Sequence, residues 1–82
     1  MDISGVLVRS YPENSQSVQQ ALALMAGVEV HGSNEDGRIV VTVEQENAGK
    51  MSDLLVLMHD VPGVLSTSMI YHQFEDLPLT DN

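Results

Sequence analysis

A hairpin signal in the middle of the chain constrains the fold more than any other feature. The turn Asn34-Glu35-Asp36-Gly37 joins two short runs, residues 28–33 and 38–44, in which valine or isoleucine alternates with other residues. An Asp-Gly pair between alternating runs is a strong signal for two antiparallel strands joined by a tight turn. The rest of the chain therefore has to be arranged around this strand pair.

The segment before the hairpin combines a strand pattern with a helix pattern. Residues 2–11 alternate with apolar members on both faces, which is typical of a strand inside a sheet, and Pro12 ends the run because proline cannot donate to a neighbouring strand. From Asn14 or Ser15 to about Ala26, apolar residues recur at helical spacing, and Gly27 follows where helices commonly end. One strand followed by one helix is predicted.

The segment after the hairpin repeats these patterns in the reverse order. Asn47 is a suitable N-cap for a helix that reaches His59 or Asp60 and carries a stripe of leucine and methionine. The turn Val61-Pro62-Gly63 ends this helix and leads into an uncharged run, residues 64–73. The order β-α-β-β-α-β predicts an α+β, ferredoxin-like fold: a four-stranded antiparallel sheet with two helices on one face, the last run forming an outer strand beside the first.

Length and composition fit one small domain. The chain has 82 residues, enough for a single core, and it has no cysteine, which excludes disulfides and thiolate chemistry. We expect a domain over residues 1–75 and a flexible, polar tail over residues 76–82. The amino terminus has no basic leader, and no apolar stretch approaches the roughly 18 residues that span a membrane. The expectation is a soluble, cytoplasmic protein without stable membrane association.

The charge balance favours a basic partner. Twelve Asp and Glu oppose three Lys and Arg, which gives a formal net charge of −9. Nucleic-acid binding is disfavoured because phosphate contacts need the opposite sign, whereas a segment carrying Arg or Lys would be attracted. Alternatively, the acids only keep a small protein soluble. The acids expected at the ends of the sheet are Glu29, Glu35, Asp36, Glu44 and Glu46.

The sheet face without helices is the candidate contact surface. Strict alternation assigns every second side chain of a strand to this face. The residues predicted to lie there are Ile3, Gly5, Leu7 and Arg9, then Val40, Thr42 and Glu44, then Ser66, Ser68, Ile70 and His72. In the last strand the other set, Leu65, Thr67, Met69 and Tyr71, is expected to pack on the helices. The face would be apolar but low, with Gly5, Ser66 and Ser68 as gaps, and such patches are commonly contact sites. The alternatives are a dimer that buries two such faces against each other, or ordinary apolar residues on the surface.

The sequence contains no set of residues that predicts catalysis or a cofactor. His31, His59 and His72 belong to three different elements without metal-binding spacing, and the single glycines form no phosphate loop. Ser68 and His72 share a predicted face, but four residues of strand separate them by roughly 13 Å, too far for a hydrogen bond. We therefore expect no enzyme activity, no metal and no cofactor.

Three segments of the chain resemble the NapD family. They are residues 3–8, residues 37–44 and, most specifically, the ending G-V-L-x-x-S-hydrophobic-hydrophobic-Y-H-Q over residues 63–73. The resemblance extends from Ile3 to about Glu75. It implies a small cytoplasmic chaperone that binds the twin-arginine signal peptide of the catalytic subunit of the periplasmic nitrate reductase and holds back export until the molybdenum cofactor is inserted. It also implies that the peptide binds as a helix on the sheet of a ferredoxin-like fold.

The resemblance and the strand alternation together give a set of expected peptide-binding residues. They are Ile3, Gly5, Leu7, Val40, Thr42, Glu44, Ser66, Ser68, Ile70 and His72. A peptide that is basic at one end and apolar in its middle suits an acidic protein with a low apolar face. Arg9 would repel the arginines of the peptide unless it pairs with Glu44 or lies at the far rim. The expected chaperone is a monomer or weak homodimer; the alternative is a regulatory small-ligand module of the ACT type, which would form a stable dimer.

Overall fold

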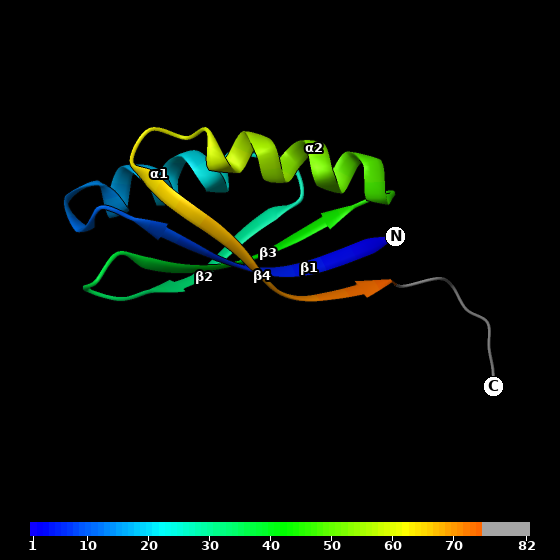
Figure 1. Ribbon diagram of the computed structural model, residues 1–82, viewed down its shortest axis with the longest axis horizontal. Helices are drawn as coiled ribbons and strands as arrows, with labels where there is room; N and C mark the ends of the chain where they lie inside the picture. Colours follow the sequence, from blue (N-terminus) through cyan, green and yellow to red (C-terminus); the bar gives the residue numbers. More distant parts are fainter. Residues whose placement is uncertain (75–82) are drawn as a thin grey trace.

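The chain folds into a four-stranded antiparallel sheet with both helices on one face (Figure 1). The structure is a computed structural model, and it describes residues 1–74. The strand order is β2-β3-β1-β4. The elements are β1 (Asp2–Ser10), the short 3-10 helix η1 (Pro12–Asn14), α1 (Ser15–Ala23), β2 (Val28–Ser33), β3 (Arg38–Gln45), α2 (Ala48–His59) and β4 (Val64–Phe74). The predicted ferredoxin-like βαββαβ fold is therefore confirmed, and β4 is the outer strand beside β1.

The division into a domain over residues 1–75 and a tail over residues 76–82 stays a prediction, because the proposed tail lies outside the described residues. No helix within residues 1–74 is long and apolar enough to cross a membrane.

The core lies between the helices and the inner face of the sheet. Its fully buried side chains come from alternate positions of the central strands, Val6 and Val8 on β1 and Ile39, Val41 and Val43 on β3. The helices add residues at helical spacing, namely Val18, Leu22, Met51, Leu54 and Met58. Since alternate residues of a strand point to opposite faces, the intervening side chains of β1 and β3 lie on the face without helices.

The two helices begin and end for different local reasons. Asn47 caps α2 as predicted, because its side-chain oxygen accepts a hydrogen bond from the Lys50 backbone N–H at 2.9 Å. Helix α1 ends at Ala23, three residues before the predicted end. After the helix, the Gly27 carbonyl accepts a hydrogen bond from the Glu44 N–H at 2.8 Å. Gly27 has a φ of +83°, and a Cβ there would overlap the Glu44 carbonyl, so glycine suits both the conformation and the contact.

Strand β4 is not regular along its length. Its pairing with β1 shifts by one residue twice, once between Gly5 and Val6 of β1 and once between Arg9 and Ser10. The residues of β4 without a partner at these points are Ile70 and Leu65. A bulge of this kind places two residues opposite one and changes which side chains of the strand reach each face.

Candidate functional site

The face of the sheet without helices is called the open face below. On its two central strands the register places Ile3 opposite Glu44, Gly5 opposite Thr42, Leu7 opposite Val40, and Arg9 opposite Arg38. The face assignments predicted for these two strands are confirmed, because the neighbouring residues of β1 and β3 form the core. From β4 the open face receives Ser66, Ser68 and Tyr71, and from the outer strand β2 it receives Glu29.

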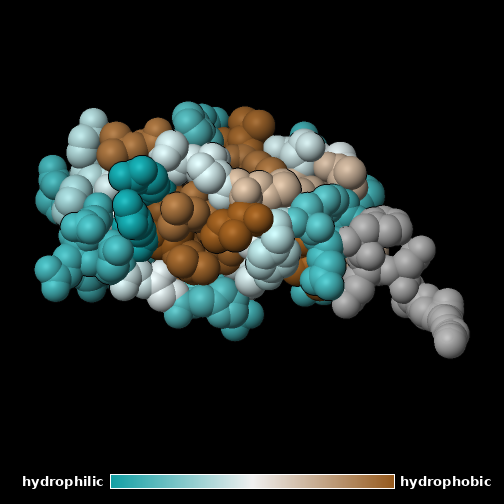
Figure 2. Space-filling model, turned by 60° about the horizontal axis from the view of Figure 1, so that its bottom comes forward, coloured by the Kyte–Doolittle hydropathy of each residue, from teal (hydrophilic) through white to brown (hydrophobic). Residues whose placement is uncertain are grey.

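The middle of the open face is apolar and accessible. Val40 is 41% exposed and Tyr71 is 47% exposed, with Leu7 half-buried on the strand between them. Figure 2, which brings this side of the molecule forward, shows apolar surface gathered mid-face with hydrophilic surface beside it. Exposed apolar side chains that lie together, rather than singly, are typical of contact surfaces.

A shallow hollow deepens one side of this apolar area. Its volume is about 330 Å³, and it is lined by Leu7, Gly32, Ser33, Asn34, Arg38 and Val40. The hollow exists partly because Gly32 has no side chain, and no atom lies within 4 Å of the place where a Cβ would be. Side chains of an incoming segment could therefore enter between the β2-β3 hairpin and the apolar residues of β1 and β3.

On β4 the predicted positions of Ser66 and Ser68 are correct, and those of Tyr71 and His72 are wrong. Ser66 lies opposite Arg9 and Ser68 opposite Leu7, both on the open face as predicted. Beyond them, Ile70 is an extra residue without a partner on β1, so the alternation changes phase. Tyr71 then pairs with Gly5 on the open face, and His72 pairs with Ser4 on the inner face, the reverse of the prediction.

The second irregularity corrects the prediction at the start of β4. Leu65 was expected to pack on the helices, but it is the extra residue there and is 49% exposed. Val64, its neighbour, lies opposite the buried Ser10 and packs against the core in its place.

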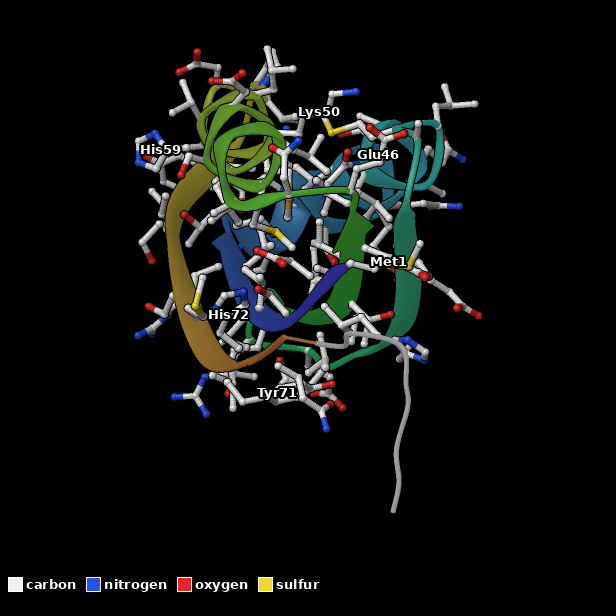
Figure 3. The ribbon with its side chains drawn as sticks, turned by 90° about the vertical axis from the view of Figure 1, so that its right-hand side faces the viewer. Met1, Glu46, Lys50, His59, Tyr71 and His72 are labelled. Carbon is white, nitrogen blue, oxygen red and sulfur yellow. The ribbon has the colours of Figure 1, made fainter. Side chains whose placement is uncertain are left out.

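Tyr71 fills the gap that was predicted at Gly5. A Cβ added to Gly5 would overlap the Tyr71 ring, so the ring lies directly over the glycine backbone. Figure 3 shows Tyr71 on the side away from the helices and His72 on the inner side of the same strand. The open face is therefore low at Ser66 and Ser68 but carries an aromatic ring at Gly5. Tyr71 is 47% exposed, which leaves part of its ring available to a partner.

His72 belongs to a polar cluster under the helices instead of the open face. Its Nε2 lies 3.3 Å from Oδ2 of Asp2, whose side chain is only 2% exposed. Oδ1 of Asp2 and Oγ of Ser4 are buried without a hydrogen-bond partner among residues 1–74. The cluster joins the last described residues of β4 to the first residues of β1, which indicates a structural role for His72.

The ends of the open face carry opposite charges. Arg9 and Arg38 lie opposite each other at one end, and no Asp or Glu of residues 1–74 forms an ion pair with either. Glu44 lies at the other end, with Glu29 opposite Thr42 beside it. Arg9 thus lies at the far rim, one of the two positions considered for it, and does not pair with Glu44.

Two side-chain contacts refine the acidic end. His31 Nε2 lies 2.7 Å from Oγ1 of Thr42 and 4.0 Å from Oε1 of Glu29, so this histidine stands between the two on the open face. Glu46 is engaged elsewhere: Lys50 donates a hydrogen bond to its Oε1 at 2.9 Å (Figure 3). That hydrogen bond, together with the positive charge of Lys50, lowers the pKa of Glu46. The acids that remain available on the open face are Glu29 and Glu44.

The described residues offer no group of three or more histidine, aspartate or glutamate side chains arranged to hold a metal ion. The chemistry of the open face is that of a binding surface, with apolar contact in the middle and charge at both ends.

Comparison with known proteins identifies the family. The family model described as NapD protein matches residues 1–76 of the chain. The chain belongs to the NapD family. The proteins named Chaperone NapD from Escherichia coli (strain K12) and from Shigella flexneri are both 28% identical to it over 75 residues, which is 90% of this chain and 86% of each relative. These NapD relatives are named as chaperones, and the family is non-enzymatic.

Solved structures agree with the fold. The solution structure titled as the E. coli Tat proofreading chaperone protein NapD matches with a TM-score of 0.81 and 26% identity, covering 98% of this chain and 90% of that one. A crystal structure of a protein from Thermus thermophilus matches with a TM-score of 0.80 at 22% identity, covering 96% of this chain and 100% of that one. The second likeness concerns the fold alone.

Three features of the open face were not predicted from the sequence. They are the position of Tyr71 on this face, the hollow beside Gly32, and the placement of Arg38 directly opposite Arg9. The first depends on the bulge at Ile70, which has no local sequence signal. The other two depend on the register between strands, although Arg38 could have been placed on the open face by extending the alternation of Val40 and Thr42 back by one step.

Proposed function

We propose that this member of the NapD family is an assembly chaperone that binds the twin-arginine signal peptide of the catalytic subunit of the periplasmic nitrate reductase. Binding holds back export until cofactor insertion and folding are complete, and it takes place in the cytoplasm. The observation that carries the proposal is the open face, an accessible apolar strip on the helix-free face of the sheet, with the exposed acids Glu29 and Glu44 at one end. The E. coli relative, titled a Tat proofreading chaperone, supports the same role.

The dimensions of the open face suit a short helix. From Ile3 to Arg9 the open face is about 20 Å long, because a strand rises about 3.4 Å per residue. A helix of that length contains about 13 residues, at 1.5 Å per residue. Secretory signal peptides have a basic segment followed by an apolar stretch of about 7–15 residues, which is the same size. One apolar face of such a helix would lie on the strip, as amphipathic helices lie in apolar grooves.

Most of the residues expected from the sequence keep their place in this proposal. The proposed peptide-binding residues are Ile3, Leu7, Val40, Thr42, Glu44, Ser66, Ser68 and Ile70. Gly5 contributes indirectly, because its lack of a side chain leaves room for the Tyr71 ring on the open face. His72 is withdrawn from the site, since its side chain is paired with Asp2 on the inner side. We propose a monomer or weak homodimer as the free state, because a dimer through the open face would compete with the peptide.

A matched pair of substitutions tests the surface. Ser68 lies opposite Leu7 in the middle of the open face, and Ser52 is exposed on α2, on the opposite side of the molecule. Ser68→Arg adds a bulky charge where the apolar part of the peptide would lie, so we expect its affinity for a synthetic twin-arginine signal peptide to fall by at least about tenfold in calorimetric titration. Ser52→Arg makes the same change of charge and should bind as the wild type does.

Circular dichroism shows whether the loss of peptide affinity arises from the changed surface or from unfolding. The Ser68→Arg variant should keep the wild-type spectrum, because the residue is exposed. Equal affinities for the two variants, or an equal loss in both, would contradict the proposed site.

A further inference from the structure

The open face carries positive charge at one end and negative charge at the other, so its two ends differ. On β3 the positions run from Arg38 through Val40 and Thr42 to Glu44, and each has its counterpart on β1 in the order Arg9, Leu7, Gly5 and Ile3. The arginines and Glu44 are separated by six residues of strand, roughly 20 Å. At physiological salt this exceeds the screening length of about 8 Å, so each end presents its own charge to a partner.

The two arginines form an arrangement that the fold alone does not favour. Like charges directly opposite each other on neighbouring strands destabilise a sheet. Neither guanidinium has an acidic partner within 4.0 Å among residues 1–74. Glu35 and Asp36 lie in the nearby hairpin turn but form no ion pair with either arginine. In a chain with only three Lys and Arg, two of the three therefore meet on the surface that the peptide would occupy.

The charges of a helical signal peptide have a matching polarity. Its arginines precede the apolar stretch, so they lie at the amino-terminal end of the helix. The backbone dipole adds about half a positive charge at that end and about half a negative charge at the carboxyl end. A helix with its amino-terminal end at Glu29 and Glu44 therefore has favourable electrostatics at both ends. The reversed helix would place the arginines of the peptide against Arg9 and Arg38.

We propose that the signal-peptide helix docks in a single orientation, with its twin arginines at Glu29 and Glu44 and its carboxyl end at Arg9 and Arg38. The helix then runs in the same direction as β1, from Ile3 towards Arg9, with its apolar stretch over Leu7, Val40 and Tyr71. Glu29 and Glu44 select the arginines, and the arginine pair acts mainly by rejecting the reversed helix, as repulsive elements do in specific interfaces. This inference rests on the proposed function.

Disulfide cross-linking reads the orientation directly, because the chain has no cysteine of its own. Gln73 lies opposite Ile3 at the acidic end of β4, and Ser66 lies opposite Arg9 at the basic end. Each position is changed singly, Gln73→Cys or Ser66→Cys, and mixed with peptides that carry one cysteine either before the arginines or after the apolar stretch. We expect Gln73→Cys to couple mainly with the first peptide and Ser66→Cys mainly with the second, each with a preference of about tenfold or more.

Calorimetry on the same pairs separates the two proposals. Binding with the reversed cross-linking pattern, or with no preference, overturns the orientation and leaves the proposed function intact. Absence of binding by the wild-type chain overturns the proposed function itself, and the orientation with it.

Exchange of the charges at the two ends of the open face tests the orientation independently. The variant with Glu29→Arg, Glu44→Arg, Arg9→Glu and Arg38→Glu keeps the net charge of the chain but inverts the polarity of the open face. Checked for folding by circular dichroism, it should reverse the cross-linking preference. An unchanged preference in the folded variant would show that shape, and not charge, sets the orientation, and would overturn the proposal. If the variant does not fold, Glu44→Arg with Arg38→Glu is the smaller exchange, for which a weakened preference is expected.

Discussion

At the scale of single residues, the contact between Gly5 and Tyr71 shapes the open face most. The ring lies where a Cβ of residue 5 would be, so the glycine is required by the aromatic residue and not by a turn. The sequence indicated that Gly5 was special but assigned it the wrong role, an empty space for a partner. The two residues are 66 positions apart in the chain, and nothing local shows that they meet.

Substitution at residue 5 should therefore depend on residue 71. We expect Gly5→Ala to lower the free energy of unfolding by about 1–3 kcal/mol, the usual cost of inserting a group into an occupied space, as measured in urea. In the Tyr71→Ala background the same change should cost much less, so that the double-mutant cycle shows coupling between the two sites. Additive effects would mean that the ring does not cover Gly5.

At the scale of elements, the sequence predicts most accurately what is determined locally. The hairpin signal at Asp36-Gly37, the capping side chain of Asn47 and the apolar stripes of both helices all describe neighbours in the chain, and each is confirmed. The faces of β1 and β3 were predictable because their pairing is regular. The face of β4 was predictable only from Ser66 to Met69, because the extra residues Leu65 and Ile70 arise from pairing with β1, at the other end of the chain.

Removal of the extra residue tests this account of β4. Deletion of Ile70 should leave Tyr71 opposite Gly5 and His72 opposite Ser4, since it converts the bulge into regular pairing. The free energy of unfolding should therefore change by no more than about 1 kcal/mol, while peptide affinity falls through loss of an exposed apolar side chain. A strand that alternated strictly would respond differently: the deletion would exchange the faces of Tyr71 and His72, and stability would drop by several kcal/mol.

At the scale of the whole molecule, the placement of charge is more informative than its total. The net charge of −9 suggested a basic partner, but it did not show that the open face itself is basic at one end. The acids of this face are Glu29 and Glu44, since Lys50 engages Glu46 and Asp2 is buried beside His72. Peptide binding is therefore expected to depend on a small number of acids at one end of the sheet and to weaken as salt increases.

A single titration tests whether the open face binds a twin-arginine signal peptide. The wild-type chain is titrated by calorimetry with the native peptide and with a version in which both arginines are replaced by glutamine. We predict clear binding of the native peptide, weaker at high salt, and at least about tenfold weaker binding of the glutamine version. No heat with the native peptide, or equal affinity for both peptides, would contradict the account.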